Sequence, residues 1–362
     1  MLVHICCSVD SHFFLQKLAT IYPKERLIGF FYDPNIHPYN EYLLRLEDVR
    51  RSCEKLKIEL IEGDYDFENW LCCVNGLENE PEKGKRCNVC FDNRLEKTAL
   101  KALEIGEKMI TTTLLTSPKK SIESLSKSLE AIAQKYNLSY VAPDFRINGG
   151  TTEQFALAKK DKLYHQNYCG CMFALEAQRK EQNRYLDELC TPITKQILPS
   201  SIEERLELFR KVQECEKNGI QFSLERKKFL NYRLLRAFVK NPLKNIVPSY
   251  FMFYSIPNKT YQKVKIQNIS KNQAFTLKQE AFFISIEGVN LLAKTSYKSV
   301  MDLIQNPLHV AFEISLREMI LPDDFISLTP IIIIDELIEG NYEVYCDAIM
   351  YSDVREVLAI IS

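Results

Sequence analysis

The first half of the chain alternates short apolar runs with longer segments in which apolar residues recur at helical spacing. The apolar runs predict strands at residues 2–6, 27–32, 58–61, 109–114 and 138–142. Residues 42–56 and 121–136 have helical spacing, and the charged stretch GLENEPEKGK at residues 76–85 has the turn residues of an exposed loop. This alternation is typical of strand–helix–strand units, so it predicts an α/β fold built on a parallel sheet.

The pattern changes after the stretch TPITKQILPS at residues 191–200, where two prolines and the loss of the cysteine pattern indicate a linker. Residues 202–239 have a helical pattern rich in Lys and Arg, whereas residues 261–292 and 331–350 have the pattern of strands. A chain of 362 residues exceeds the usual size of a single core. We therefore expect two domains, residues 1–190 and an α+β extension at residues 200–362.

The charge balance gives no overall attraction for a polyanion, since the formal net charge is −1 and the calculated pI is about 6.6. Contact with a nucleic acid must then rely on a local patch. One candidate is a basic run in which Phe229, Tyr232 and Phe238 are interleaved, so that a helix would present cations to RNA and bury the aromatic rings. A solvated face is the simpler interpretation. The cations are Arg226, Lys227, Lys228, Arg233, Arg236, Lys240 and Lys244.

Twelve cysteines are many for this length, and two pairs, Cys6-Cys7 and Cys72-Cys73, are adjacent and so poorly placed for disulfides. The N-terminus enters a strand-like run without the features of a signal peptide, and no apolar stretch is long enough to span a bilayer. These features predict a cytoplasmic protein, without a membrane partner, in which thiols bind metal rather than form disulfides.

Three cysteine groups fall near the predicted strand ends, where open α/β sheets bind their ligands. Cys6-Cys7 ends the first strand and is followed by Asp10, while C-x-x-C and C-G-C pairs occur later in the chain. Together they would offer six thiolates and a carboxylate, more than one structural zinc requires, which favours a cluster or a cluster with a second metal. The two pairs are Cys87 with Cys90 and Cys169 with Cys171.

The remaining cysteines are interpreted as small apolar core residues, the usual role of an isolated cysteine. They are Cys53, Cys72, Cys73, Cys190, Cys215 and Cys346.

An ordered series of motifs runs from Met1 to about Glu176: HICC, PNIHPYNEYLLR, RCNVCFDNRLEKTA, TTTLLTSP, DFR and YHQNYCGC. In this order the motifs resemble the cobalamin-independent epoxyqueuosine reductases of the QueH type. The resemblance implies an oxidoreductase that removes the epoxide oxygen from the wobble nucleoside of tRNA, the last step of queuosine synthesis. It also implies a fold related to the adenine-nucleotide α-hydrolases, a [4Fe-4S] cluster with an adjacent mononuclear iron, no cobalamin, and an electron donor such as a ferredoxin or flavodoxin.

Carried onto this sequence, the resemblance makes thiolate ligands of Cys6, Cys7, Cys87, Cys90, Cys169 and Cys171. Many family members carry a further cysteine shortly after the first pair, where this chain has Ser8, Val9 and Asp10. Asp10 is therefore the candidate carboxylate ligand of the second iron and a catalytic residue. The chemistry is suitable, because a cluster supplies electrons singly and a Lewis-acidic iron stabilises negative charge developing on the epoxide oxygen.

Several other side chains are candidates for contact with the substrate. Asn35 and His37 lie in a Pro-rich turn, where His37 could donate a proton or contact a base, or simply satisfy a loop carbonyl. Glu41 and Arg45 follow at helical spacing, which also suits a surface ion pair.

Later candidates combine hydroxyls, arginines and aromatic rings. Thr112, Thr113 and Ser117 precede a helix and suit either a phosphate or ordinary capping. Arg94 and Arg146 could pair with phosphate or with buried carboxylates. Three side chains next to the C-G-C pair could stack on or hydrogen-bond a splayed base, or be core: Tyr164, Gln166 and Tyr168.

Two other functions fit parts of the sequence. A tRNA thiolase of the PP-loop type is suggested by Ser8-Val9-Asp10-Ser11 after the first strand, but the glycines that let backbone amides approach a phosphate are missing. A zinc-stabilised RNA-binding module would use the C-x-x-C and C-G-C pairs and leave Cys6-Cys7 unexplained.

Overall fold

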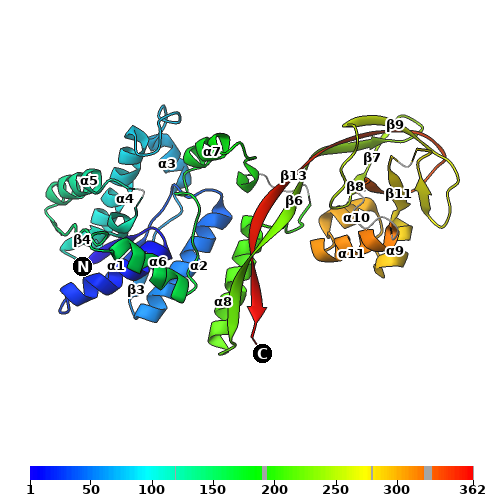
Figure 1. Cartoon of the computed structure of the whole chain (residues 1–362). Coiled ribbons are helices and arrows are strands. Elements are labelled where there is room, and N and C mark those ends of the chain that lie inside the picture. The colour runs from blue at the N-terminus through cyan, green and yellow to red at the C-terminus, as the bar shows by residue number, and fades with distance from the viewer. Residues whose placement is uncertain (119, 190–193, 279, 322–327, 362) are drawn as a thin grey trace. The chain divides into compact units, whose positions relative to one another are not determined.

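The computed structural model describes residues 1–118, 120–189, 194–278, 280–321 and 328–361. The chain forms two compact units (Figure 1). The first comprises Met1–Cys190, Arg205–Leu224 and Leu358–Ser362, and the second comprises Thr191–Glu204 and Glu225–Val357.

The first unit is built on a five-stranded sheet in the order β3-β2-β1-β4-β5. All of its described strand pairs are parallel, as the alternating sequence pattern predicts. The parallel α/β fold class is thus confirmed, with strand order of the doubly wound type. The strands are β1 (Leu2–Ile5), β2 (Ile28–Phe31), β3 (Glu59–Glu62), β4 (Met109–Thr112) and β5 (Ser139–Tyr140).

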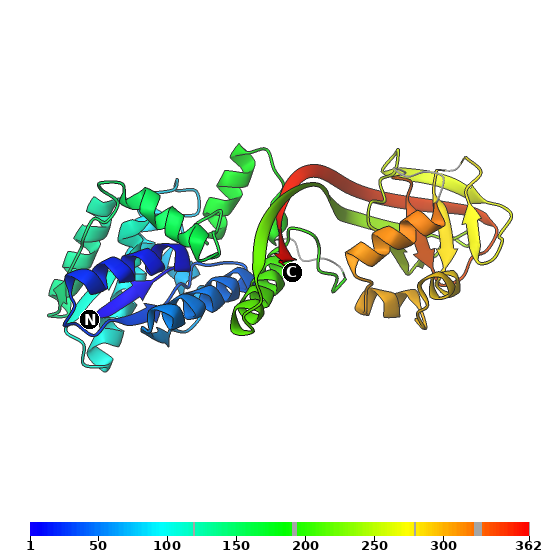
Figure 2. The same ribbon diagram turned by 60° about the horizontal axis from the view of Figure 1, so that its bottom comes forward.

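Helices cover both faces of this sheet, as Figures 1 and 2 show. One face packs against α1 (Ser8–Ile21), α2 (Tyr39–Leu56) and α6 (Gly150–Lys160), and the other against α4 (Lys85–Glu104) and α5 (Ile122–Lys135). The shorter elements are α3 (Phe67–Cys73), η1 (Thr113–Thr116), α7 (Met172–Glu181) and η2 (Asp187–Leu189).

The sequence of strand β1 is a largely apolar run, not an alternation of apolar and polar residues, because both faces of the strand are buried. Leu2 packs with the α4 and α5 side of the sheet, whereas Val3 and Ile5 pack with the α1 and α2 side. A central strand buried on both faces needs apolar residues at successive positions. The chain then leaves the sheet at Cys6 and enters α1, which puts the first cysteine pair at the carboxyl edge of the sheet.

The second unit is an α+β arrangement, as expected. Its sheets have the orders β10-β11-β12-β8 and β7-β6-β13-β9. The strands are β6 (Phe222–Lys240), β7 (Ile246–Val247), β8 (Ser249–Phe251), β9 (Tyr261–Ile266), β10 (Gln273–Phe275), β11 (Phe282–Ser285), β12 (Ile331–Ile334) and β13 (Gly340–Ile360). The helices are α9 (Ile286–Ala293), α10 (Val300–Gln305) and α11 (Val310–Ile320).

The helix predicted for residues 202–239 is correct only in its first part, α8 (Ile202–Lys217). The remainder forms strand β6, which lies between β7 and β13. Pairing with those strands overrides the helical propensity of the Lys- and Arg-rich sequence. Most of α8 belongs to the first unit, which includes Arg205–Leu224, and Leu206 and Phe209 pack with Leu44 and Tyr164 there.

The basic run on β6 is not the cationic helix face that the sequence suggested. Arg226 pairs with Glu356, and Lys240 and Lys244 both pair with Glu343. Lys227 pairs with Glu225, and Arg233 is buried, where it donates to the carbonyl of Pro199. Most of these cations therefore have a carboxylate or carbonyl partner within the chain. Among the described residues, no helix is both long and apolar enough to cross a membrane.

Candidate metal centre

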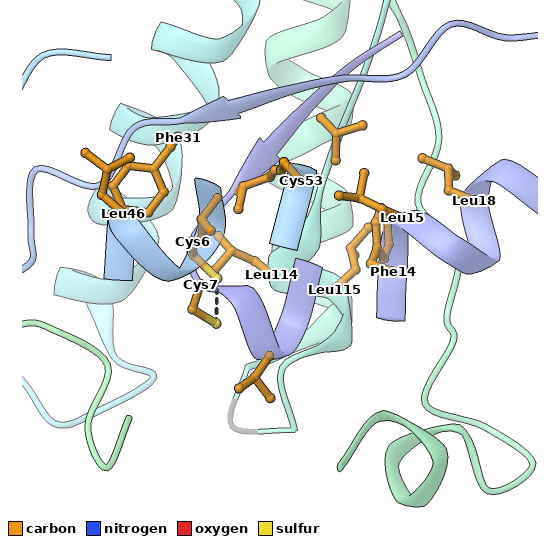
Figure 3. Close-up of a cluster of buried hydrophobic side chains, with 14 of the residues drawn as sticks. Cys6, Cys7, Phe14, Leu15, Leu18, Phe31, Leu46, Cys53, Leu114 and Leu115 are labelled. Carbon is orange, nitrogen blue, oxygen red and sulfur yellow. Dashed lines mark hydrogen bonds between the residues drawn. The ribbon is translucent and has the colours of Figure 1, made fainter. Parts of the chain in front are cut away.

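The first cysteine pair and Asp10 form one compact donor set. Sulfur atoms of Cys6 and Cys7 and a carboxylate oxygen of Asp10 all lie within 4.8 Å of one another, and all three residues are buried. Cys7 is the N-cap of α1 and Asp10 lies in its first turn, so the helix start fixes their spacing. Figure 3 shows both cysteines beside the apolar cluster that includes Phe14 and Leu15 of α1.

Neighbouring polar groups hold this donor set in place. Gln154 of α6 donates to Asp10 Oδ1 at 2.7 Å, while Asp10 Oδ2 lies 3.6 Å from Cys6 Sγ. Thr113 Oγ1 lies 3.7 Å from the same sulfur. Burial raises the pKa of Asp10, and a hydrogen bond with Cys6, together with burial, raises the pKa of the Cys7 thiol. A bound cation would favour the deprotonated forms of both.

The other four predicted cysteine ligands line one small cavity of about 20 Å³. Cys87 and Cys90 come from the first turns of α4, and Cys169 and Cys171 from the loop before α7. Burial raises the pKa of Cys90, while a hydrogen bond from Cys171 lowers the pKa of Cys169. The cavity is also lined by Asn35, Trp70, Arg86, Phe91, Arg94 and Lys120.

Arg94 connects the two donor sets. Its guanidinium pairs with Asp33 and interacts electrostatically with both Cys90 and Cys6. Burial raises the pKa of Asp33 to about 6 despite this pairing. The structure therefore brings all three predicted cysteine groups to the carboxyl edge of the sheet.

Side chains of α2 hold the C-G-C loop. Arg45 donates to the carbonyls of Tyr168 and Cys169 at 3.0 and 3.2 Å, and its Nε donates to Glu41 at 2.8 Å. The second Glu41 oxygen accepts the hydroxyl of Tyr164 at 2.9 Å. Glu41 and Arg45 are 0% and 3% exposed, so the sequence interpretation of a surface ion pair is wrong. This network fixes the loop that carries Cys169 and Cys171.

A second contact fastens the same loop to the Pro-rich turn. Gly170 has φ +103°, and its carbonyl accepts the backbone N–H of His37 at 2.9 Å. Tyr168 donates its hydroxyl to the His37 carbonyl at 2.6 Å. The His37 ring stacks on Phe67 with centroids 4.7 Å apart, and burial lowers its pKa.

Replacing Gly170 with alanine is expected to destabilise this loop. A Cβ at Gly170 would lie 2.7 Å from Ile36 Cγ1, and the positive φ is itself unfavourable for alanine. We expect a loss of about 1–3 kcal/mol in the free energy of unfolding, measured by urea denaturation. Gly106→Ala is the matched control, since Gly106 has φ +75° with nothing within 4 Å of its Cβ position. Equal losses in both variants would contradict a role for the Ile36 contact.

Several predicted substrate-binding side chains have internal partners. Thr112 Oγ1 lies 2.9 Å from His4 Nδ1, and Arg146 donates to the carbonyls of Ser117 and Lys120 at 3.1 and 2.9 Å. Arg146 also pairs with Asp144. These contacts shape the loop after β4 and leave little of Thr112 or Arg146 for a phosphate.

Two predicted substrate-binding residues, Asn35 and Gln166, differ from Thr112 and Arg146. Each has a buried side-chain oxygen without a partner among the described residues. Asn35 donates to the Cys169 carbonyl at 3.4 Å, but its Oδ1 is unsatisfied, as is Oε1 of Gln166. Of these, Asn35 lines the cysteine cavity.

Lys120, Arg86 and Trp70 line the cysteine cavity and were not anticipated from the sequence. Burial lowers the pKa of Lys120, but the thiolates of Cys169, Cys87 and Cys90 outweigh this and raise it. Lys120 lies two residues after the TTTLLTSP motif, but no local sequence feature distinguishes it from a surface lysine. Trp70 lies on α3. Cys72 and Cys73 lie on the same helix and are exposed, so the prediction that these two cysteines are core residues is wrong. Cys53, Cys215 and Cys346 are buried as predicted, and Cys190 lies outside the described residues.

Comparison with known proteins gives a consistent result. Residues 1–177 match the model of the family described as epoxyqueuosine reductase QueH. The QueH of Helicobacter pylori is 43% identical over 361 residues, which cover 94% of this chain and 95% of that protein. The QueH of Acinetobacter baylyi is 39% identical over 51% of this chain and 83% of its own length. For the QueH of Thermotoga maritima the identity is 34% over 50% of this chain and 93% of its own length. The chain therefore belongs to the epoxyqueuosine reductase QueH family.

Proposed function

We propose that this chain reduces epoxyqueuosine to queuosine at the wobble position of tRNA, using a [4Fe-4S] cluster and an adjacent iron, without cobalamin. The observation that carries the proposal is the meeting of all three cysteine groups at one sheet edge in a member of this family. The reaction takes up two electrons and two protons and releases water. A ferredoxin or flavodoxin is the proposed electron donor.

The two donor sets suit different metal groups. Two thiolates and a carboxylate within 4.8 Å of one another fit a single ion and leave coordination positions open. The four cysteines around the cavity do not form so tight a set, which fits a cluster, since each thiolate binds a different iron atom. We therefore assign Cys87, Cys90, Cys169 and Cys171 to the cluster. Cys6, Cys7 and Asp10 are assigned to the single iron.

The charges of the cavity fit an anionic occupant. Arg86 donates to the carbonyls of Leu77, Glu78 and Glu80, and among the described residues neither Arg86 nor Lys120 has a carboxylate within ion-pair distance. A buried cation is unfavourable without a compensating charge. A cluster bound by four thiolates carries net negative charge and would compensate both.

The chain's own residues would divide the work as follows. The metal groups, when bound, supply electrons and a Lewis acid. Gln154 keeps the Asp10 carboxylate oriented toward Cys6, and Arg45 keeps the C-G-C loop closed. Asn35 offers an unsatisfied acceptor oxygen to a donor of the substrate, and the Lys120 ammonium stabilises negative charge near the cysteines. His37, stacked on Phe67, is the proposed contact or proton donor at the rim.

The test is an anaerobic assay of the iron-reconstituted protein on tRNA bearing epoxyqueuosine, with dithionite and without cobalamin. Nucleosides released by digestion are read by mass spectrometry, and loss of one oxygen mass is expected. No conversion by protein with a full complement of iron and sulfide would overturn the proposal. Thiolation of the same tRNA, tested in parallel with ATP, would then replace it.

Replacing Lys120 with methionine is expected to lower the reduction potential of the centre, because a cation that favours the added electron is lost. A unit charge about 10 Å away at an effective dielectric constant of about 20 contributes about 1.7 kcal/mol, on the order of 70 mV. The potential is read by redox titration of the electron paramagnetic resonance signal. Lys120→Arg should retain most of it. Lys127→Met, at an exposed lysine of α5, is the control, and an equal shift there would refute the assignment.

A further inference from the structure

The second unit contains a cavity of about 180 Å³ that the proposed reductase function does not use. It lies among β6, β8, α10 and the segment before α8. Its lining includes aromatic residues Tyr232, Tyr250, Phe251 and Phe253. An apolar cavity of about 150 Å³ is large enough to hold benzene. The cavity therefore has room for one small aromatic ring system.

The lining carries no charged side chain among the described residues. The nearest buried carboxylate, Glu313, is already engaged, since it accepts the Tyr250 hydroxyl at 3.0 Å, the Gln196 amide at 2.6 Å and the Phe253 backbone N–H. Tyr232 likewise donates its hydroxyl to the Ser255 carbonyl at 3.1 Å. Both tyrosines thus have their hydroxyls tied elsewhere. A charged ligand would find no counter-charge here, so the cavity suits a neutral one.

Gln196 supplies a specific hydrogen-bonding group. It is only 8% exposed and lines the cavity. Its amide nitrogen must face Glu313 Oε2 and the Leu308 carbonyl, at 2.6 and 2.9 Å, because both partners are acceptors. The amide oxygen is therefore fixed as the remaining atom, and it has no partner among the described residues. Because Gln196 lines the cavity, this oxygen is available to accept a hydrogen bond from a donor on a ligand.

Two hydroxyls complete the polar part of the lining. Thr194 accepts the Gln196 backbone N–H at 3.3 Å and keeps its own hydrogen available, and Ser249 makes no hydrogen bond through its side chain among the described residues. One fixed acceptor beside two hydroxyl groups matches a ring edge that carries both an N–H donor and a carbonyl or ring-nitrogen acceptor. The nucleobases are rings of this kind.

We propose that this cavity binds a neutral nucleobase, stacked among the aromatic side chains and hydrogen-bonded by Gln196 and Ser249. The Thermotoga maritima relative is matched over 93% of its length by about half of this chain, so the second unit is an addition to the part shared with that relative. Two sources offer the same chemistry, namely a base splayed from an RNA strand and a free nucleoside. Splayed bases held by aromatic stacking are a common mode of single-stranded RNA recognition.

The first arm of the test measures free ligands on the full-length protein by saturation-transfer NMR. The probes are uridine, cytidine, adenosine, guanosine and benzene. At least one nucleoside is expected to bind, and Ala237→Leu, which places a larger side chain in the cavity lining, is expected to weaken that binding at least tenfold. Ser249→Ala should weaken it less. Leu235→Met, at an exposed position of the same strand outside the lining, is the control and should leave binding unchanged.

The second arm measures tRNA affinity by fluorescence anisotropy at one fixed salt concentration. If the base belongs to RNA, Ala237→Leu is expected to weaken tRNA binding about tenfold, in keeping with the loss of one stacked base. If the ligand is a free nucleoside, tRNA affinity stays unchanged while nucleoside binding is lost. Binding of benzene alone, or no effect of a folded Ala237→Leu variant in either arm, overturns the proposal. Because both arms measure binding, failure here leaves the reductase proposal standing.

Discussion

Replacing Cys90 with serine is expected to abolish reduction of epoxyqueuosine and to lower bound iron and sulfide sharply. Cys90 lies in the first turns of α4 and lines the cavity with three further cysteines. A serine hydroxyl is a poor ligand for iron, so one corner of the proposed cluster would lose its protein ligand. Activity should fall by at least about a thousandfold, in line with removal of an essential catalytic group. Iron and sulfide analysis, visible absorption and the mass-spectrometric assay measure the effect.

The matched control for this variant is Cys72→Ser. Cys72 lies on α3, close in sequence to Trp70 of the same cavity, but its side chain is exposed. It should keep the iron content, absorption spectrum and activity of the unmodified protein. Full iron content and activity in Cys90→Ser would show that the cavity does not hold the cluster. Iron loss in both variants would instead indicate general instability of reconstituted protein.

Replacing Arg45 with alanine is expected to reduce the free energy of unfolding by about 3–5 kcal/mol. The change removes the cation that is hydrogen-bonded to the buried Glu41 carboxylate and leaves the carbonyls of Tyr168 and Cys169 without this donor. The loop that carries Cys169 and Cys171 should then open, so iron retention after reconstitution should also fall. Urea denaturation of the metal-free protein measures the first effect, and iron analysis after gel filtration measures the second.

The same helix offers a control of the same residue type. Arg50 pairs with Glu62 through side chains that are 44% and 39% exposed. Surface pairs contribute about 0–1 kcal/mol, so Arg50→Ala should change little. Arg45→Lys restores the charge but not the forked donor geometry, and we expect it to recover stability only in part. Equal effects of Arg45→Ala and Arg50→Ala would contradict the role given to the buried network.

The fold of the first unit could be predicted closely because its signals are local. Each apolar run is short enough for one strand and is separated by a segment of helical spacing, and both faces of β1 are buried. The positions of Cys6, Cys87 and Cys169 at strand or helix ends then follow from the element boundaries. The second unit was harder, since the Lys- and Arg-rich residues 222–239 favour a helix locally and become strand β6 through pairing distant in sequence.

The burial of particular polar side chains also could not be predicted from the sequence. Glu41 and Arg45 have the spacing of a surface pair, and nothing in their own helix shows that the C-G-C loop covers them. Lys120 carries no sequence feature that distinguishes it from ordinary surface lysines, and it joins the site because Arg146 holds the carbonyls of its loop. Cys72 and Cys73 read as apolar helix positions but face away from the core.

The sequence alone determines the parallel α/β class, the cysteine groups and the family motifs. These features are local, because periodicity and short motifs depend only on residues close together in the chain. The tertiary structure decides which cysteines and carboxylates lie together and which cations face them. It also decides where Gln196 and the rings of the second unit enclose a cavity. These arrangements depend on contacts between residues more than a hundred positions apart. Those contacts form because they lower the packing and strand-pairing energy of the whole fold. A short stretch of sequence does not determine that energy.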